Sequence, residues 1–443
     1  MFDTIRNAWK IVDLRKKLIY TFVMLIIFRL GSTIPVPLID PSQLQSIFNT
    51  ENSMFGFIDI VSGGAFKNAT IFAMSITPYI NSSIIMQLLC VAIPALERLQ
   101  KEGEEGRKKI GQMMRYGTVV LALIQAVGLY SLLKSYNVVT NPGWGAAVVI
   151  ISTFTAGTAF LMWLGEQITE KGVGNGISLI IFAGIVSRIP SMARTLYAYV
   201  EGGTLNWIMV ALILVFALLI IAFVVMMNEA ERRLPVQYAK RVVGRKMYGG
   251  QSTHIPIKVA GAGVIPIIFA MSIMAFPGTI ASFFGKNAQS GGFWGGFLWV
   301  FSGQSWIYAV LYFLLIIFFT YFYTAIQFNP IEMSNNMKKN GGFIPGVKPG
   351  RKTMEFLDTI MSRITLPGSI FLGIVAILPA FATIAGVNQQ FAQFYGGTSL
   401  LILVGVVLDT LQQIESHLLM RHYDGLMKTG RIKGKTPGGP AAY

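Results

Sequence analysis

Residues 55–89 read FGFIDIVSGGAFKNATIFAMSITPYINSSIIMQLL, an apolar stretch that stops, breaks and restarts. As a helix, the first piece would cover only about half of a ~30 Å hydrocarbon core before the Ser62-Gly63-Gly64 run ends or bends it. The second piece is long enough to span, yet it carries the polar side chains of Thr77, Asn81, Ser82, Ser83 and Gln87. A broken segment at membrane depth is tolerated only where it is buried in protein or lines a water-filled cavity. The stretch therefore predicts a protein-lined pathway through a membrane.

The composition is that of an integral membrane protein. Hydrophobic residues make up 53% of the 443-residue chain, charged residues 13%, and the mean hydropathy is +0.58. The lone cysteine, Cys90, excludes a disulfide framework, and three histidines leave little for a metal site. The first apolar run, 18–36, is too long for the core of a signal peptide and contains Arg29, so it is predicted to be a first membrane span.

Ten apolar runs of spanning length predict an all-α polytopic membrane protein. They lie near residues 18–36, 69–92, 114–134, 146–166, 176–194, 206–227, 259–284, 305–327, 363–385 and 398–418. Nearly all of the 36 Lys and Arg residues fall in the two ends of the chain and in alternate loops. The exceptions are Arg29 in the first span and Lys67, Lys134, Arg188, Arg194 and Lys286 on the other side. Basic loops stay in the cytoplasm, so both termini are predicted to be cytoplasmic.

Two long basic loops, 228–258 and 328–363, follow the sixth and eighth spans. The first has a β-prone VQYA run and a Gly249-Gly250 turn signal, which predict a hairpin-like protrusion. Its cations are Arg232, Arg233, Lys240, Arg241, Arg245 and Lys246. Attraction to anionic lipid accounts for their sign but not for the length of the loops. Docking of an acidic partner, such as nucleic-acid phosphate or an acidic protein face, is the better interpretation.

The sequence contains no recognisable catalytic constellation, cofactor motif or metal motif. There is no HExxH, and GRIKGKT at 430–436 is one residue short of a P-loop and lacks the flanking strand and helix. The spans lack the mid-membrane acids and histidines of an ion-coupled transporter, and Arg29 is the only deep charge. A secondary transporter for a small solute and a purely structural assembly role remain as alternatives. Isoleucines at four-residue spacing are by themselves ordinary membrane-helix residues.

Several runs together resemble the bacterial SecY family, whose members form the channel of the general protein-translocation system. They are SGGAF, PYINSSIIMQLL, EGEEGRKKIGQMMRYGT, TAGTAFLMWLGEQITEKGVGNGIS, QYAKRVVGRKMYGGQSTHIPIKV, AGVIPIIFA, FIPGVKPG and GGTSLLI, in this order between about residues 5 and 425. The resemblance implies two inverted five-span halves, 1–205 and 206–423, around a central pore. Residues 424–443 are interpreted as a flexible basic tail.

The resemblance also implies roles for individual residues. A hydrophobic pore ring would consist of Ile76, Ile80, Ile177, Ile181, Ile268, Ser272 and Ile402. A plug near 57–66 would include Phe57, Ile58, Ile60, Val61, Ser62, Gly63 and Gly64. The second and third spans, facing the seventh and eighth, would form a lateral gate with polar positions Gln87 and Gln125. A ring of this kind would block ions by dewetting and close around a threaded chain.

The partners implied by the resemblance are the small membrane subunits SecE and SecG, the motor ATPase SecA, the ribosome, and signal peptides and nascent chains. Anionic lipid is expected around the basic loops, and the cytoplasmic membrane of a bacterium is the expected location. Lys348, Arg351 and Tyr423 join the loop cations as docking candidates. The chain departs from the family pattern at Ala260, where Asn is usual, and at Lys348, where Arg is usual. Lysine keeps the charge but loses the planar bidentate fork.

Overall fold

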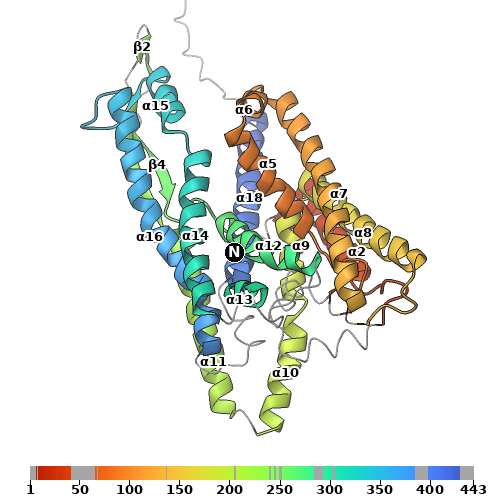
Figure 1. Cartoon of the computed structure of the whole chain (residues 1–443). Helices are drawn as coiled ribbons and strands as arrows, with labels where there is room; N and C mark the ends of the chain where they lie inside the picture. The colour runs from red at the N-terminus through yellow and green to blue at the C-terminus, as the bar shows by residue number, and fades with distance from the viewer. Residues whose placement is uncertain are drawn as a thin grey trace, which may run out of the picture.

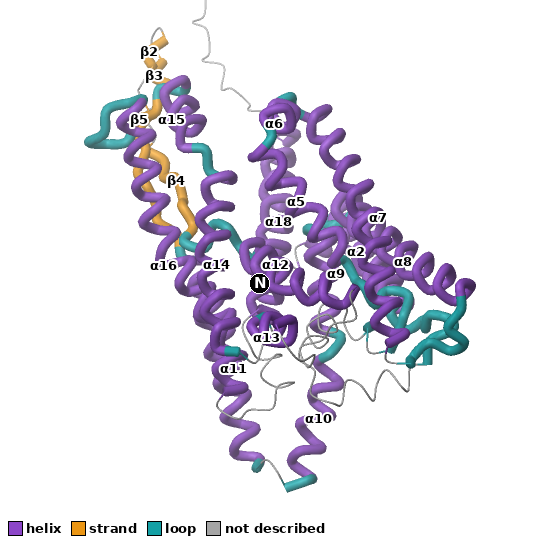
Figure 2. Tube along the Cα trace, in the orientation of Figure 1, coloured by secondary structure: helices purple, strands orange, loops and turns teal. Residues whose placement is uncertain are grey.

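The computed structural model describes residues 6, 8–40, 65–66, 68–135, 137–203, 206–238, 241–243, 246–248, 252–283, 293–301, 305–384 and 398–429. Within these ranges the chain is mostly helical, as Figure 2 shows, with a small group of strands at one end. The predicted all-α polytopic architecture is therefore confirmed.

The first part of the chain forms helices separated by short connections. They are α2 (Val12–Gly31), α5 (Thr77–Ala92), α6 (Pro94–Lys101), α7 (Glu104–Ser135), α8 (Trp144–Lys171), α9 (Gly176–Val186) and α10 (Ile189–Glu201). The fifth predicted span is thus two helices, because α9 ends at Val186 and α10 begins at Ile189, with Pro190 in its first turn.

The second part of the chain contains the remaining helices and all described strands. The helices are α11 (Trp207–Glu229), α12 (Ile265–Phe283), α13 (Phe293–Val300), α14 (Trp306–Gln327), α15 (Pro330–Lys339), α16 (Arg351–Ile384) and α18 (Thr398–Thr429). The strands are β1 (Glu231–Tyr238), β2 (Arg241–Val243), β3 (Lys246–Tyr248), β4 (Ser252–Lys258) and β5 (Gly342–Phe343).

Each of the ten predicted spans overlaps a helix or a broken helix. Among the described residues, seven helices are long and apolar enough to cross a membrane, and an eighth if α5 and α6 form one span bent by 101°. The apolar part of α12 is shorter, and α2 carries charges near both of its ends. Two helices start before the apolar run that predicted them: α7 begins 10 residues before its predicted span and α16 begins 12 residues before its own.

The start of the second span differs from the prediction. Thr70 forms an isolated β-bridge with Pro35, residues 71–76 are turns, and α5 begins only at Thr77. The Thr70 backbone N–H and hydroxyl both donate to the Ala65 carbonyl (2.9 and 3.1 Å), and the Ile71 N–H donates to the Ile34 carbonyl (3.0 Å). These tertiary bonds satisfy the backbone without a helix. The predicted plug residues before Ala65 lie outside the described residues.

The predicted hairpin in loop 228–258 is confirmed. β1 pairs antiparallel with β4 over its length, and β2 pairs with β3 at the tip. The structure adds β5 from the other long loop, which pairs with β1 at Gln237 and Tyr238. The two basic loops are therefore one structure, which projects at the top left of Figure 1 beside α15.

Helix packing follows the same order in both parts of the chain. In the first, α5 packs against α7 and α7 against α8; in the second, α12 packs against α14 and α14 against α16. Figure 1 shows α14 and α16 on one side and α7 and α8 on the other side of a centre that contains α9, α12 and α18. The largest apolar core of the described residues lies in this centre and contains side chains from both parts of the chain.

Candidate functional site: a central apolar constriction

The predicted ring isoleucines lie in one apolar cluster. We call Ile76, Ile80, Ile177, Ile181, Ile268 and Ile402 the isoleucine cluster. Ile76 is 0% exposed, and Ile181 and Ile402 are each 3% exposed; the other three are half-buried and pack against the same core. Ser272 lies half-buried on α12, one turn after Ile268. The cluster joins α5, α9, α12 and α18, which are far apart in sequence.

Local sequence signals place these side chains on their helices. Ile76 occupies the N-cap position of α5, and Pro78 lies in the first turn, where its missing N–H costs nothing. Asn175 caps α9 by accepting a hydrogen bond from the Ser178 N–H (3.3 Å). The four-residue spacing of Ile177 and Ile181 puts both on one face of α9.

Aromatic packing holds the segment that leads into α5. The ring of Phe72 stacks on Phe28 of α2 at 6.1 Å and on Phe160 of α8 at 5.9 Å between centroids. A side chain at Gly157 would collide with the Ile71 carbonyl oxygen, so only glycine allows α8 this close. Ile76 therefore has a defined position although the residues before it are not helical.

The isoleucine cluster has the chemistry of a barrier. β-Branched apolar side chains in contact offer no hydrogen-bond partner to water or ions and exclude both by dewetting. Within the described ranges, no group of three or more His, Cys, Asp and Glu residues could hold a metal ion. The six isoleucine side chains have no group for acid–base or nucleophilic chemistry, and their role as a pore ring stays a prediction.

A charged pair links α7 and α8 near the isoleucine cluster. Local sequence patterns do not reveal this pair. The Arg115 Nε on α7 lies 2.8 Å from the Glu166 Oε1 on α8. Tyr79, which precedes Ile80 on α5, interacts electrostatically with both charges. The two charged residues are 51 positions apart and carry no spacing that would connect them, so only the packing of α7 on α8 brings them together.

The helices of the predicted lateral gate touch. α12 packs against both α5 and α7, and α5 is joined to α7 where the Ser82 hydroxyl donates to the Met114 carbonyl (2.8 Å). Gln87 donates to the Ser83 hydroxyl of its own helix (3.3 Å), and Gln125 is half-buried on α7. Ala260 is buried in the turn before α12. The gate roles of these three residues stay predictions.

The strand-bearing loops form a platform with its own core. Leu234, Val236, Ile257, Met337, Ile344, Leu357 and Ile360 are buried together, joining β1 and β4 to α15, the β5 segment and α16. We call this structure the hairpin platform. The docking candidates Arg232 and Arg233 are exposed on β1, and the Arg233 Nε lies 2.7 Å from the Glu231 Oε1. The hairpin platform therefore exposes these two cations on strands that are held by a buried apolar core.

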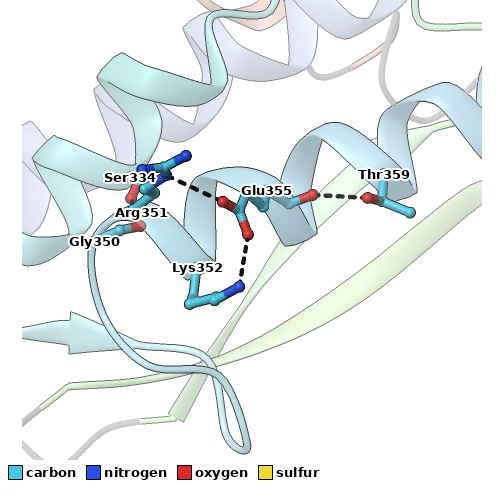
Figure 3. A network of polar contacts seen from close by, with 6 residues as sticks. All are labelled: Ser334, Gly350, Arg351, Lys352, Glu355 and Thr359. Atoms are coloured by element: carbon cyan, nitrogen blue, oxygen red, sulfur yellow. Dashed lines mark hydrogen bonds and ion pairs between the residues drawn. The ribbon is translucent and has the colours of Figure 1, made fainter.

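A polar network shapes the turn that carries Lys348 and Arg351, as Figure 3 shows for its α16 side. Ser334 on α15 donates to the Gly350 carbonyl (2.8 Å), and Thr353 donates to the Lys348 carbonyl (3.0 Å). Glu355 accepts from both Arg351 (3.2 Å) and Lys352 (3.0 Å). The turn is fixed by these bonds, while the Lys348 and Arg351 side chains remain exposed.

Other docking candidates are described only in part. Lys240 and Arg245 lie outside the described residues. Arg241 and Lys246 belong to the paired strands β2 and β3, and Tyr423 belongs to α18; only their backbone is described. The docking roles of all these residues stay predictions.

Comparison with known proteins identifies the family. The sequence model of the SecY family matches residues 70–411. A protein translocase subunit SecY from Halalkalibacterium halodurans is 47% identical over 439 residues, which are 97% of this chain and 100% of that protein. Proteins with the same description from Streptomyces galbus and Vibrio cholerae are each 44% identical, covering 97% and 95% of this chain and 100% and 96% of theirs.

Solved structures share the fold. The chain matches a structure described as a protein conducting channel with a TM-score of 0.65 and 19% identity, covering 94% of this chain and 95% of that one. It matches Sec61 in the canine ribosome–channel complex with a TM-score of 0.61 and 18% identity at the same coverage. With a family model that spans most of its length and relatives that align from end to end, this chain belongs to the SecY family.

Proposed function

We propose that this chain forms a protein-conducting channel, which passes unfolded, signal-bearing polypeptides across a membrane and releases apolar segments sideways into lipid. The observation that carries the proposal is the isoleucine cluster, contributed by four helices from distant parts of the sequence. At rest its side chains seal the channel against ions. During transport they would close around the moving chain, because branched apolar side chains can pack on any extended polypeptide.

The two halves 1–205 and 206–423 would be the moving bodies of this channel. The repeated packing order of α5, α7 and α8 and of α12, α14 and α16 supports this division. Separation of α12 from α5 and α7 would open a path from the centre to lipid. Residues 57–66 would act as a plug on the outer side of the isoleucine cluster. The last two residues of this segment, Ala65 and Phe66, are buried, which supports a position inside the protein.

Orientation and partners follow from the charge distribution. The hairpin platform would face the cytoplasm, with both termini on the same side of a bacterial cytoplasmic membrane. There it would dock SecA or the ribosome, while SecE and SecG pack around the spans and anionic lipid borders the basic loops. One of the matched structures is Sec61 within a ribosome–channel complex, and this likeness supports a ribosome contact in the present chain.

Site-specific crosslinking tests the path. Cys90 is replaced by Ser, Ile402 by Cys, and a secretory chain with a single cysteine is stalled during transport. We expect a disulfide at a narrow set of positions in the stalled chain, because only one short segment lies in the constriction at a time. A cysteine at the exposed Trp144 serves as the control and should not react. Absence of any disulfide at Ile402→Cys, at every position tried, would contradict the proposed path.

Charge reversal tests docking at the platform. The double change Lys348→Glu and Arg351→Glu should weaken binding of the motor ATPase or the ribosome, and raising salt should reduce the difference from the parent. Both side chains are exposed, and the exposed Arg351–Glu355 pair that the change breaks contributes little. The Ser334 and Thr353 hydroxyl bonds that hold the turn before α16 are retained, so the fold should persist. Lys134→Glu at the far end of α7 is the matched control. Binding that is indifferent to the double change would leave only lipid attraction as the role of these charges.

A further inference from the structure

The loop between α8 and α9 is bonded from two sides. The Val173 N–H donates to the Thr21 hydroxyl of α2 (3.0 Å), and the Gly174 N–H donates to the Gln413 Oε1 of α18 (3.0 Å). The second bond joins residues 239 positions apart, one in each half of the proposed channel. The loop therefore connects the two halves directly.

The residues around the Gly174–Gln413 bond are closely packed. Gly174 has φ of +87°, and a Cβ there would stand 3.1 Å from the Thr410 hydroxyl oxygen, so glycine permits both the backbone conformation and the close approach to α18. The neighbouring Val173 is buried in one apolar cluster with Ile414 of α18 and Leu14 of α2. We call Thr21, Val173, Gly174, Gln413 and Ile414 the clasp.

The two helices joined by the clasp also carry isoleucine-cluster residues. Ile177 and Ile181 follow Gly174 within about two turns of α9. Ile402 precedes Gln413 by 11 positions on α18, about 16 Å along the helix axis. Further bonds stiffen the connection between the clasp and α9: Gly176 donates to the Thr169 hydroxyl (2.9 Å), and Thr169 donates to the Gly165 carbonyl (2.9 Å). A shift of the loop would consequently move Ile181 relative to Ile402.

We propose that Gln413 is a positioning residue that sets the closed form of the isoleucine cluster by holding α9 against α18. This inference rests on the proposed channel function and assigns different roles to the two sides of the channel. The α9–α18 side stays joined through the clasp, while the α5–α12 side, where the helices pack against each other, would separate. The clasp thereby directs opening toward the lateral gate.

Three variants of the channel, assembled with its companion subunits in proteoliposomes, test the clasp. Gln413→Ala removes the acceptor and should raise resting ion leak roughly 2- to 10-fold, the range expected for loss of one hydrogen bond. Gln413→Glu keeps an acceptor oxygen and should restore the parental leak. Gln412→Ala is the matched control, because Gln412 bonds Lys258 of its own half (2.7 Å). Thermal unfolding of all three should match the parent.

The seal variant Ile402→Asn, measured in parallel, separates the two proposals. If it leaks and Gln413→Ala does not, the clasp is overturned while the proposed channel stands. Equal leak from Gln413→Ala and Gln413→Glu also overturns the clasp, because the hydrogen bond then plays no part. If neither Ile402→Asn nor Gln413→Ala leaks, the isoleucine cluster is not the seal, and the clasp, which acts through that cluster, is overturned with it.

Discussion

Ile402→Asn is expected to raise resting ion leak by roughly 5- to 150-fold and to allow transport of chains with defective signal sequences. Ile402 is buried among apolar side chains of several helices, where an amide finds no partner. An unsatisfied buried polar group costs about 1–3 kcal/mol, which here destabilises only the closed form and shifts the population toward the open one by that factor. The measurements are conductance in planar bilayers and export of a signal-defective reporter.

Ile402→Val is the matched control, since it keeps a β-branched apolar side chain. Its leak should stay near that of the parent, because a smaller apolar residue leaves no polar group for water to solvate. Unchanged leak together with unchanged signal stringency in Ile402→Asn would remove the isoleucine cluster as the seal. The comparison also distinguishes polarity from volume, because a leak from both variants would point to packing alone.

Gly176→Val is expected to prevent assembly of a stable channel. A Cβ at Gly176 would collide with the Gly165 carbonyl oxygen and lie 2.8 Å from the Ile168 Cβ, so α9 could not begin against α8. Overpacking of this kind costs about 1–3 kcal/mol and more where the obstacle is backbone. Cys90 is the lone cysteine and is buried, so its reaction with a thiol dye on heating reports unfolding. The variant should react at a clearly lower temperature or fail to accumulate.

Gly145→Ala provides the control, because a Cβ at Gly145 on α8 would have no atom within 4 Å. Alanine favours the helix over glycine by about 1 kcal/mol, so this variant should unfold no earlier than the parent. A Gly176→Val protein with parental thermal stability would show that α8 and α9 can separate without loss of the fold. That outcome would also weaken the clasp, which depends on the same start of α9.

Much of the architecture could be predicted from the sequence. Spanning length is a local property, so runs such as 206–227 and 305–327 correspond closely to α11 and α14. The β-prone VQYA run and its turn signal likewise identified the hairpin of β1 and β4. Hydropathy did not reveal the water-exposed first turns of α7 and α16, because a helix can continue into water without an apolar face.

Other features depended on partners distant in the sequence. Residues 71–76 are apolar enough for a helix, but the bonds of Thr70 to Ala65 and of Ile71 to Ile34 hold this segment in turns. β5 is a two-residue strand with no recognisable pattern, and it exists because β1 offers an open edge. Gln413 carries no local signal within the last span, since its bond partner is 239 residues away.

The sequence by itself determined that this is a polytopic membrane protein whose Lys and Arg residues are concentrated in alternate loops, because hydrophobic length and charge act locally on each segment. Its family could be named from ordered motifs. Only the tertiary structure decided that isoleucines from four helices lie in one core, where α5 begins and how α9 is joined to α18. An isoleucine on a membrane helix packs equally well against lipid or protein, so its position in a constriction depends on how four helices pack, which no local pattern encodes.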